Sequence, residues 1–323
     1  MRILVTGGAG FIGSNLVESL LQNKNAELVR VLDNLATGST NNIEEFYPDS
    51  RFEFVQGDIR DYSLCLQACD GIDLITHQAA LGSVPRSIHD PLTSNEVNIT
   101  GTLNIFTAAK EKKVKRLVYA ASSSTYGDHP GLPKVEDIIG NPLSPYAVTK
   151  YVNELYAKVY ADIYDMELIG LRYFNVFGPR QSPNGPYAAV IPLFIEALLN
   201  DQSPLINGDG EHSRDFTFVS NAVQANILAL FTRNKEALNQ VYNIAYGQQT
   251  SLKQLFGYLK KTSGRTIEPT YGPERKGDVK HSLADISKAK KLLGYDPKIS
   301  VEEGLKKTFE WYMKQKQVKA EVK

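Results

Sequence analysis

The sequence Ile3-Leu4-Val5-Thr6-Gly7-Gly8-Ala9-Gly10-Phe11-Ile12-Gly13 decides the fold. A short apolar run enters a glycine-rich turn, and the apolar periodicity of residues 11–22 then predicts an amphipathic helix. Gly8, Gly10 and Gly13 fit the spacing GxGxxG, and Gly7, Gly10 and Gly13 fit the looser GxxGxxG. One glycine makes the tight turn, one lets the backbone approach a pyrophosphate, and the last lets the helix pack closely on the strand. We therefore expect a dinucleotide site whose phosphates are held by N–H groups at the helix N-terminus.

An acidic residue follows at the distance that such a site requires. Asp33 lies twenty residues after Gly13, at the end of the second expected strand. A carboxylate there accepts hydrogen bonds from the 2′-hydroxyl of an adenosine ribose and repels a 2′-phosphate. Because Asn34 and Leu35 follow and no arginine does, we expect NAD to be preferred over NADP.

Two further strand ends offer cofactor contacts. Gly57-Asp58-Ile59 closes the third expected strand, which brings Asp58 to the carboxyl edge, where an adenine amine could bind. Taken alone, Asp58 fits the role of a turn former equally well. Gln78-Ala79-Ala80 ends the fourth strand, and small side chains there leave room for the cofactor backbone.

Short β-branched segments alternate with longer amphipathic segments over the first half of the chain. We expect strands at Arg2–Val5, Leu28–Leu32, Phe52–Val55, Leu74–Thr76, Arg116–Ala120 and Leu168–Leu171. We expect helices at Phe11–Gln22, Tyr62–Ala68, Leu92–Glu111 and Pro145–Tyr164. This alternation predicts right-handed βαβ crossovers and hence an α/β protein with a Rossmann-type, doubly wound parallel sheet.

Beyond residue 175 the alternation weakens, and Pro and Gly interrupt shorter helical segments. We interpret residues 1–175 as a cofactor-binding Rossmann domain and residues 176–323 as a smaller α+β substrate-binding lobe. Segments near residues 215–245 are expected to return to the first domain. Within them, Asp215–Val219 and Val241–Ile244 are strand-like and are candidates for the first sheet.

The composition excludes several functional classes. The 323 residues include 36 Lys+Arg and 36 Asp+Glu, and zero net charge gives no general attraction to nucleic acid or anionic lipid. No apolar run reaches the ~20 residues of a membrane span, and the apolar run at the N-terminus is too short for a signal peptide. The two cysteines and five histidines lack metal-ligand spacing. We expect a cytoplasmic protein with no metal site, no nucleic-acid partner and no membrane association.

A second set of residues has the pattern of a proton-transfer site. Tyr146 and Lys150 lie one helical turn apart. A phenol titrates near ~10, and a neighbouring ammonium stabilises the phenolate so that it can act as a base. Ser122-Ser123-Ser124 follows the fifth expected strand, at the edge where open α/β sheets bind ligands, although three hydroxyls also suit a polar turn. The spacing YxxxK is weak evidence for such a site by itself. The glycine motif, the strand-end serine and the YxxxK spacing, in this order along the chain, are a far more specific signal than any one of them.

These motifs resemble those of extended short-chain dehydrogenase/reductases and, within them, the NAD-dependent UDP-hexose 4-epimerases. The resemblance covers nearly the whole chain. Within that group, the sequence is most similar to the epimerases that favour UDP-N-acetylhexosamines. The segments that carry this similarity are Ala80 to Ser87, Ser122 to Asp128 and Tyr187 to Pro192. Ser122 aligns with the family's catalytic hydroxyl, and Ser123 and Ser124 are the alternatives.

The resemblance implies two sets of contacts. The expected NAD contacts are Gly7, Gly10, Phe11, Ile12, Gly13, Asp33, Asn34, Gly38, Asp58, Ile59, Gln78, Ala79, Ala80, Asn98, Tyr146, Lys150 and Tyr173. The expected UDP-sugar contacts are Gly82, Ser83, Arg86, Ser122, Ser123, Asn175, Ala189, Val190, Asn207, Arg214, Arg275, Asp278 and Ser282. Arg214 and Arg275 would bind the diphosphate, since guanidinium groups pair well with phosphate oxygens. From the residues alone, each arginine is more simply a surface charge or a structural ion pair.

The implied reaction is reversible inversion at the sugar C4. Ser282 falls where the family places the residue that limits sugar size, and a small residue there leaves space for an N-acetyl group. We therefore expect epimerisation of UDP-GlcNAc to UDP-GalNAc and, more weakly, of UDP-Glc to UDP-Gal, through a 4-keto sugar. Tyr146 would remove the 4-hydroxyl proton, and bound NAD would take the C4 hydride and return it.

Other activities of the same fold are the alternatives. A UDP-hexuronate 4-epimerase or a decarboxylase would use the same anchors, and Arg86 would face an acetamide, a carboxylate or solvent. A 4,6-dehydratase typically carries Asp-Glu after the catalytic hydroxyl, where this chain has Ser123-Ser124. A non-catalytic NAD-binding scaffold would be expected to lose the serine or the YxxxK motif. The resemblance also implies a homodimer formed through the helices at Leu92–Glu111 and Pro145–Tyr164.

Overall fold

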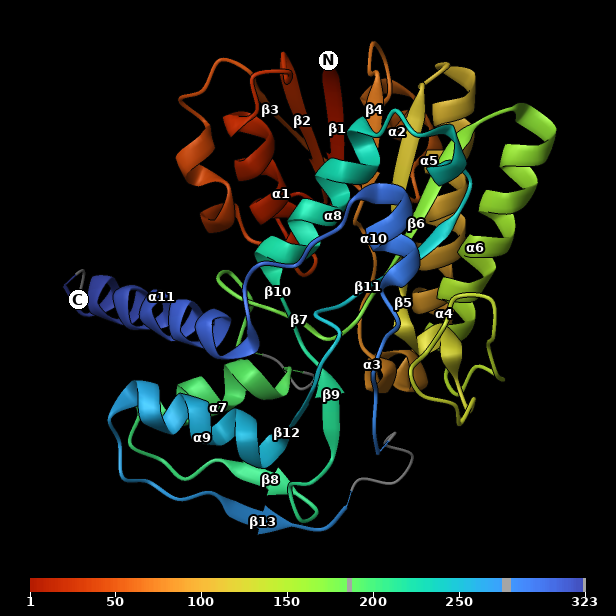
Figure 1. Cartoon of the computed structure of the whole chain (residues 1–323). Coiled ribbons are helices and arrows are strands. Elements are labelled where there is room, and N and C mark those ends of the chain that lie inside the picture. The colour runs from red at the N-terminus through yellow and green to blue at the C-terminus, as the bar shows by residue number, and fades with distance from the viewer. Residues whose placement is uncertain (185–187, 275–279, 322–323) are drawn as a thin grey trace.

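The computed structural model describes residues 1–184, 188–274 and 280–321. Its centre is a seven-stranded parallel sheet with the strand order β11-β6-β5-β4-β1-β2-β3 (Figure 1). The strands are β1 (Arg2–Thr6), β2 (Leu28–Asp33), β3 (Phe52–Gln56), β4 (Leu74–His77), β5 (Arg116–Ser122), β6 (Glu167–Tyr173) and β11 (Val241–Ile244). The predicted Rossmann-type sheet is confirmed, because the chain crosses over between β3 and β4 and so winds outward in both directions from β1.

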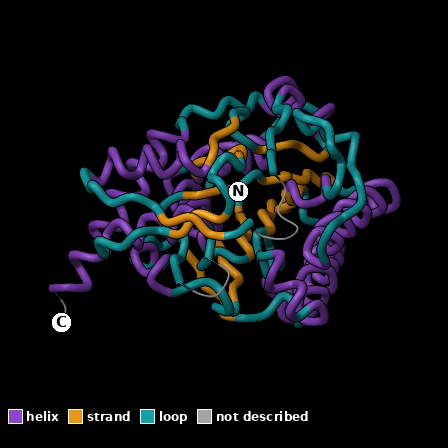
Figure 2. The backbone as a smooth tube through the Cα atoms, turned by 90° about the horizontal axis from the view of Figure 1, so that it is seen from below, coloured by secondary structure: helices purple, strands orange, loops and turns teal. Residues whose placement is uncertain are grey.

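Helices cover both faces of this sheet, as Figure 2 shows from below. On one face lie α1 (Phe11–Gln22), α8 (Val219–Phe231) and α10 (Ser287–Leu293), and on the other lie α2 (Tyr62–Ala68), α5 (Thr102–Glu111) and α6 (Pro145–Tyr164). Successive side chains of a strand point to opposite faces. Ile3 and Val5 therefore join the core under α1 and α8, whereas Leu4 joins the core under α2 and α5, and all three are fully buried.

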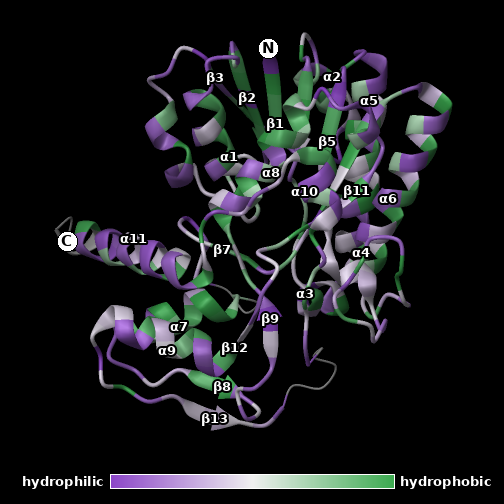
Figure 3. Cartoon of the chain, in the orientation of Figure 1, coloured by the Kyte–Doolittle hydropathy of each residue, from purple (hydrophilic) through white to green (hydrophobic). Residues whose placement is uncertain are grey.

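The second lobe lies below the sheet in Figure 1. Its elements are β7 (Val176–Phe177), α7 (Val190–Leu199), β8 (Leu205–Asn207), β9 (Ser213–Asp215), β10 (Thr217–Phe218), β12 (Gln249–Ser251), α9 (Leu252–Ser263), β13 (Thr270–Gly272) and α11 (Val301–Glu321). Apolar side chains of α7, α9 and α11, among them Phe194, Leu255 and Phe309, form a third core cluster, which also includes residues of α1 and α8. Most of the α7 ribbon has the colour of hydrophobic residues in Figure 3.

The segments expected to return to the first sheet behave differently from one another. Val241–Ile244 forms β11, which pairs with β6 and extends the main sheet. Residues 215–219 do not join it, so that expectation is wrong: β9 pairs with β12, and β10 pairs with β7, in separate two-stranded sheets. The chain returns through α8 instead, because the buried alanines of this helix allow it to pack against the strands.

The helix expected over residues 92–111 is interrupted. The structure has α4 (Pro91–Asn95), a π-helical turn at Glu96–Gly101 and then α5. Gly101 lies so close to Ile59 that a Cβ at Gly101 would be 2.6 Å from the Ile59 side chain. The remaining short helices are α3 (Val84–His89) and the 3-10 turns at Thr40–Asn42, Glu44–Phe46, Ser123–Tyr126 and Lys235–Ala237. Among the described residues, none of the helices combines the length and the apolar character that a bilayer crossing requires.

Candidate functional site

The glycine turn after β1 is packed against the end of β4. Gly7 has φ of +69°, and a Cβ there would lie 2.7 Å from the backbone nitrogen of Ala79. A Cβ on Gly13 would lie 2.0 Å from the carbonyl oxygen of Gly7. Both positions therefore require glycine, because any side chain would push the turn away from the sheet or the helix. This close packing leaves the N-terminus of α1 open to a ligand at the carboxyl edge of the sheet.

Asp33 connects the end of β2 to this turn. Its carboxylate accepts hydrogen bonds from the backbone N–H groups of Ala9 at 3.0 Å and Leu35 at 2.7 Å. Burial raises the pKa of Asp33, and these two hydrogen bonds oppose the rise. The side chain is thus fixed in the position where a ribose hydroxyl donor would meet it.

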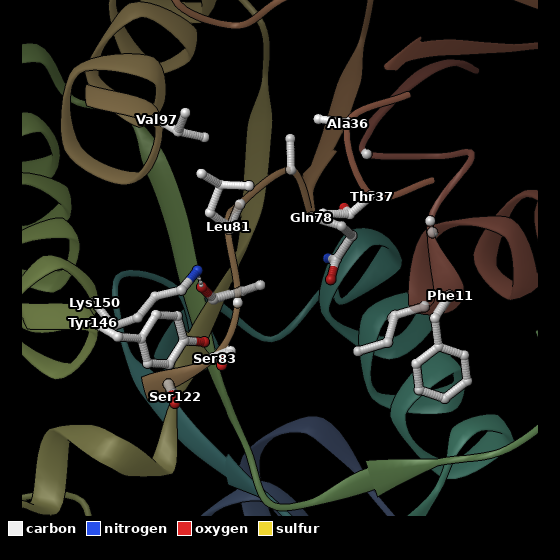
Figure 4. Close-up of a pocket in the computed structure, with 18 of the residues that line it drawn as sticks. Phe11, Ala36, Thr37, Gln78, Leu81, Ser83, Val97, Ser122, Tyr146 and Lys150 are labelled. Carbon is white, nitrogen blue, oxygen red and sulfur yellow. Dashed lines mark hydrogen bonds between the residues drawn. The ribbon is translucent and has the colours of Figure 1, made fainter. Parts of the chain in front are cut away.

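A cavity of about 650 Å³, the first cavity, extends from the glycine turn to the predicted catalytic residues. The predicted site residues that line it are Gly7, Gly10, Phe11, Ile12, Gly13, Asp33, Asn34, Ile59, Gln78, Ala79, Ala80, Gly82, Ser83, Ser122, Ser123, Tyr146, Lys150, Tyr173 and Asn175. In Figure 4, Tyr146, Lys150 and Ser122 lie on one side of this cavity and Phe11 lies on the other. Residues far apart in the sequence are therefore brought together along one elongated site.

Helix α6 positions the tyrosine and the lysine. The Ser144 side chain accepts a hydrogen bond from Ala147 N–H, and Pro145 occupies the first turn, so the helix begins immediately before Tyr146. The Lys150 Nζ atom donates to the carbonyl oxygen of Ala120 at 2.8 Å and lies 5.9 Å from the centre of the Tyr146 ring. Burial lowers the pKa of Lys150 to about 8, while Glu154 opposes this shift.

The three serines after β5 have different surroundings. Ser122 is buried, and its hydroxyl accepts a hydrogen bond from the Ser124 hydroxyl at 2.9 Å. Burial raises the pKa of Tyr146, and a hydrogen bond with the Ser122 side chain opposes that rise. Ser122 and Ser123 line the first cavity, whereas Ser124 does not. Ser122 is therefore the serine that contacts the tyrosine.

Four predicted site residues in the described part of the chain line neither this cavity nor either of the two neighbouring cavities described below. Asp58 accepts hydrogen bonds from Asn34 and Arg60, and the Arg60 guanidinium is the main cause that lowers the Asp58 pKa to about 2. The Asn98 side chain binds both backbone groups of Leu81, so it holds the loop that lines the cavity rather than lining the cavity itself. Gly38 packs on the backbone of Ala9, and Arg86 lies on α3.

The structure adds residues that the sequence analysis missed. Arg60 lines the cavity near Asn34, so an arginine does lie at this end of the site although none follows Asp33 in sequence. Asn226 of α8 is fully buried, donates to the Tyr173 hydroxyl at 2.7 Å and accepts from the Gln78 amide at 3.1 Å. A polar side chain on the same helix face as the buried Ala222 and Ala229 was the signal that could have identified it.

Two further cavities adjoin the first one. The second cavity, of about 680 Å³, is lined by Ala189, Val190, Asn207 and Arg214 of the second lobe. The third cavity, of about 720 Å³, is lined by Ser122, Ser123, Ser124, Arg214 and Ser282. Asn175, whose φ is +37°, lines all three cavities. Arg275 and Asp278 lie outside the described residues.

Comparisons with known proteins identify the family. The family described as "NAD dependent epimerase/dehydratase family" matches residues 3–245. The chain belongs to this family. It is 40% identical to a protein named putative UDP-glucose 4-epimerase from Methanocaldococcus jannaschii, over 96% of this chain and 97% of that protein.

Solved structures of the family share the fold. The UDP-N-acetylglucosamine 4-epimerase from Methanobrevibacter ruminantium M1, in complex with UDP-N-acetylmuramic acid, has a TM-score of 0.91 and 40% identity, covering 97% of this chain and 98% of that one. The UDP-glucuronic acid 4-epimerase from Bacillus cereus, with UDP-glucuronic acid and NAD, has a TM-score of 0.89 and 35% identity, covering 98% of this chain and 100% of that one. The cofactor of this chain is NAD, and the glycine turn and the fixed carboxylate of Asp33 fit it.

The glycine turn yields a first prediction. Gly13→Ala should weaken NAD binding by at least about 10-fold, because the new Cβ has no room beside Gly7 and displaces the turn. Gly257→Ala is the matched control, since a Cβ at Gly257 of α9 would contact nothing within 4 Å. Calorimetric titration of NAD into protein stripped of its bound cofactor measures both variants, and unchanged NAD affinity of Gly13→Ala would refute the proposed role of the turn.

Proposed function

We propose that the protein is a UDP-hexose 4-epimerase that interconverts UDP-GlcNAc and UDP-GalNAc and, more weakly, UDP-Glc and UDP-Gal. The observation that carries this proposal is that the first cavity, which holds Tyr146, Lys150 and Ser122, meets the second and third cavities at Asn175. A sugar at this junction would expose its C4 hydroxyl to Tyr146 while its nucleotide extends into the second lobe. The family match and the two epimerase structures described above support the same reaction.

The proton at the 4-hydroxyl is handled by this chain's own side chains. Tyr146, as the phenolate, would accept that proton, with the Ser122 hydroxyl in the same hydrogen-bond relay. Burial disfavours the phenolate, so it needs positive charge beside it, and protonated Lys150 supplies that charge. NAD supplies the hydride acceptor of the reaction when bound. The 4-keto sugar would then be reduced on its opposite face, which inverts C4.

The second lobe would hold the nucleotide while the sugar turns over. Arg214 lines both the second and the third cavity, and its guanidinium would pair with the diphosphate. Asn207, Ala189 and Val190 line the second cavity, which has the size of a nucleotide site. Firm anchoring of UDP lets the sugar alone rotate, so the intermediate stays bound between the two half-reactions.

The N-acetyl preference rests on Ser282. This side chain is small and lines the third cavity together with Ser122 and Ser123. The cavity's volume of about 720 Å³ leaves room for an acetamido group beside the sugar ring. A bulky residue at Ser282 would fill that room.

Removal of the phenol tests the proposed base. Tyr146→Phe should lower kcat for C4 epimerisation by about 10²–10⁴-fold, because it removes the proton acceptor and leaves the ring in place. The variant should still copurify with NAD, which absorbance and release assays measure. Tyr151→Phe is the control, since Tyr151 is on the same helix and lines none of the three cavities. Substantial epimerisation by Tyr146→Phe would remove Tyr146 from this role.

Filling the third cavity tests the sugar preference. Ser282→Tyr should lower kcat/KM for UDP-GlcNAc by at least about 100-fold by overpacking the acetamido space, with UDP-Glc turnover spared. Ser282→Ala keeps the space and should retain both activities. The two substrates are compared by product chromatography. An equal loss on UDP-GlcNAc and UDP-Glc would contradict the proposal.

We also propose that the protein is a homodimer. Exposed apolar side chains form a stripe along α6 and the adjoining α4, and these residues are Leu92, Val148, Leu155, Val159 and Ile163. An apolar stripe of this kind is typical of a helix that packs against a second subunit. A second copy that presents the same two helices would bury it.

Val159→Glu should therefore convert the dimer to a monomer, because it introduces a charge into the apolar stripe. Val318→Glu places the same charge at an exposed position of α11, far along the chain from the stripe, and should leave the assembly unchanged. Light scattering after size-exclusion chromatography gives the mass of each variant. A wild-type protein that is monomeric at micromolar concentration would contradict the proposal.

A further inference from the structure

A buried asparagine on α8 joins two residues of the first cavity. Asn226 is fully buried and lines none of the three cavities. Its Nδ2 atom donates a hydrogen bond to the Tyr173 hydroxyl at 2.7 Å, and its Oδ1 atom accepts one from the Gln78 amide at 3.1 Å. Tyr173 and Gln78 both line the first cavity, and Figure 4 shows Gln78 between Tyr146 and Phe11 in that view. Asn226 therefore holds the wall of this cavity from outside it.

The carbonyl oxygen of Ala222 sets the direction of every hydrogen bond in this group. A carbonyl oxygen only accepts, so the Asn226 atom 2.8 Å from it is the amide nitrogen, and the Asn226 oxygen faces Thr76 and Gln78. The Thr76 hydroxyl donates to that oxygen at 3.1 Å and accepts from the Gln78 amide nitrogen at 2.9 Å. The Gln78 oxygen then accepts from the Tyr173 hydroxyl at 3.0 Å. Each side chain is thus held in one orientation.

An apolar residue in place of Asn226 would attach α8 to the sheet equally well. Ala222, Ala225 and Ala229 of the same helix are fully buried and pack in this way. A buried amide avoids a desolvation cost only when its hydrogen bonds are made, and a fully paired network then fixes the groups that it joins. What the asparagine adds over an apolar residue is therefore the orientation of its polar partners.

The network connects the two ends of the first cavity. Tyr173 ends β6 and is paired in register with Ser122 of β5. Gln78 follows β4, and its backbone N–H donates to the Thr6 carbonyl at 3.0 Å. A Cβ at Gly7 would lie 3.0 Å from the Gln78 carbonyl carbon. Since β5 separates β4 from β6 in the sheet, α8 links strand ends that do not pair with each other.

The network also separates the two phenols of the first cavity. The Tyr173 hydroxyl donates to Gln78 and accepts from Asn226, so its proton is held by the chain. Burial raises the pKa of Tyr173 to about 12, and the two hydrogen bonds oppose that rise. Tyr173 therefore stays protonated at neutral pH and keeps its proton within the wall. Tyr146, with Lys150 5.9 Å from its ring centre, is left as the phenol for proton transfer.

We propose that Asn226 is a positioning residue of the cofactor site, which fixes Gln78 and Tyr173 in the wall beside the nicotinamide half of NAD. Asp33 lies at the adenosine end of the first cavity, so the nicotinamide half extends toward the end that carries Tyr146. Without Asn226 the two wall side chains would lose their fixed orientation. The effect on cofactor binding is independent of the sugar, whereas the effect on turnover rests on the proposed UDP-hexose 4-epimerase function.

Two variants and one matched control test the network. Asn226→Leu keeps the approximate size of the side chain and removes its hydrogen bonds. Thr76→Val removes one hydroxyl of the network at nearly constant shape. Asn221→Leu is the control, because Asn221 is also buried on α8 but binds the backbone of Lys298 and Ile299. Calorimetric titration of NAD into protein stripped of its cofactor gives Kd, and thermal unfolding records stability.

Asn226→Leu should raise the Kd for NAD by at least about 10-fold, because it leaves polar groups of Gln78 and Tyr173 unpaired. Thr76→Val should raise it by about 3-fold, and Asn221→Leu should lower stability with the Kd unchanged. In turnover of UDP-GlcNAc, Asn226→Leu should lower kcat while the KM for the sugar nucleotide stays within about 2-fold, since the second lobe holds the nucleotide.

A double-mutant cycle shows whether Asn226 acts through the phenol. Tyr173→Phe removes the hydroxyl that Asn226 orients. If the two side chains act as a unit, the Kd increase of the double variant should be at least about 3-fold smaller than the product of the two single increases. Independent, multiplicative increases would overturn action through Tyr173.

The binding measurements alone decide the inference. An unchanged Kd for NAD in Asn226→Leu and Thr76→Val would overturn it, and so would an equal rise in Asn221→Leu, which would indicate only a general loss of α8 packing. If Asn226→Leu does not fold, an unchanged Kd in Thr76→Val is sufficient to overturn it. The titrations contain no sugar nucleotide, so they remain decisive if the protein epimerises no UDP-hexose and the proposed function fails.

Discussion

The close contact between the glycine turn and the end of β4 is the constraint on which the rest of the site depends. Gly7 and Gly13 leave no room for a side chain, so the turn, α1 and the sheet pack at backbone distance. The same packing directs Ala9 N–H to Asp33 and leaves the helix N-terminus facing the first cavity. A chain that lost this contact would lose both the phosphate end and the ribose end of the cofactor site.

The second organising feature is the junction at Asn175. The residue follows β6 at the point where the chain leaves the main sheet for the second lobe, and it adopts a left-handed conformation there. Its side-chain amide donates to the Asp215 carbonyl at 3.1 Å, which ties β9 to the end of β6. Asp215, which is fully buried, accepts hydrogen bonds from the N–H groups of Gly247 and Ala284. Thus the segments that carry Arg214 and Ser282 are anchored to the sheet that carries Tyr146.

Sequence patterns predicted the parts of the site that depend on local spacing. The glycine turn, Asp33 and the pair Tyr146–Lys150 follow from strand, turn and helix periodicity, and the structure brings them to one cavity. Residues set by tertiary contacts were less predictable. Asn226 reaches Tyr173 from a helix far along the chain, and Asn98 supports a loop instead of lining the cavity.

In the fold too, the elements set by local sequence were predicted, whereas those set by tertiary contacts were not. The strands of the first half form where their β-branched runs predict them, because each run is short and bounded by turns. Residues 215–219 have a strand-like sequence as well, but their pairing depends on partners in β7 and β12 that no local pattern reveals. The π turn at Glu96–Gly101 likewise ends at a glycine whose close approach to Ile59 is a tertiary contact that no local pattern reveals.

The claim that C4 is oxidised and reduced within one closed site is tested most directly by isotope tracing. The purified protein, without added NAD, is incubated with UDP-GlcNAc that carries deuterium at C4, in ordinary water. Our interpretation predicts UDP-GalNAc with the deuterium retained at C4, because the hydride leaves and returns without exchange with solvent. Failure to form the C4 epimer, or formation of an epimer that has lost its deuterium to solvent, would contradict it.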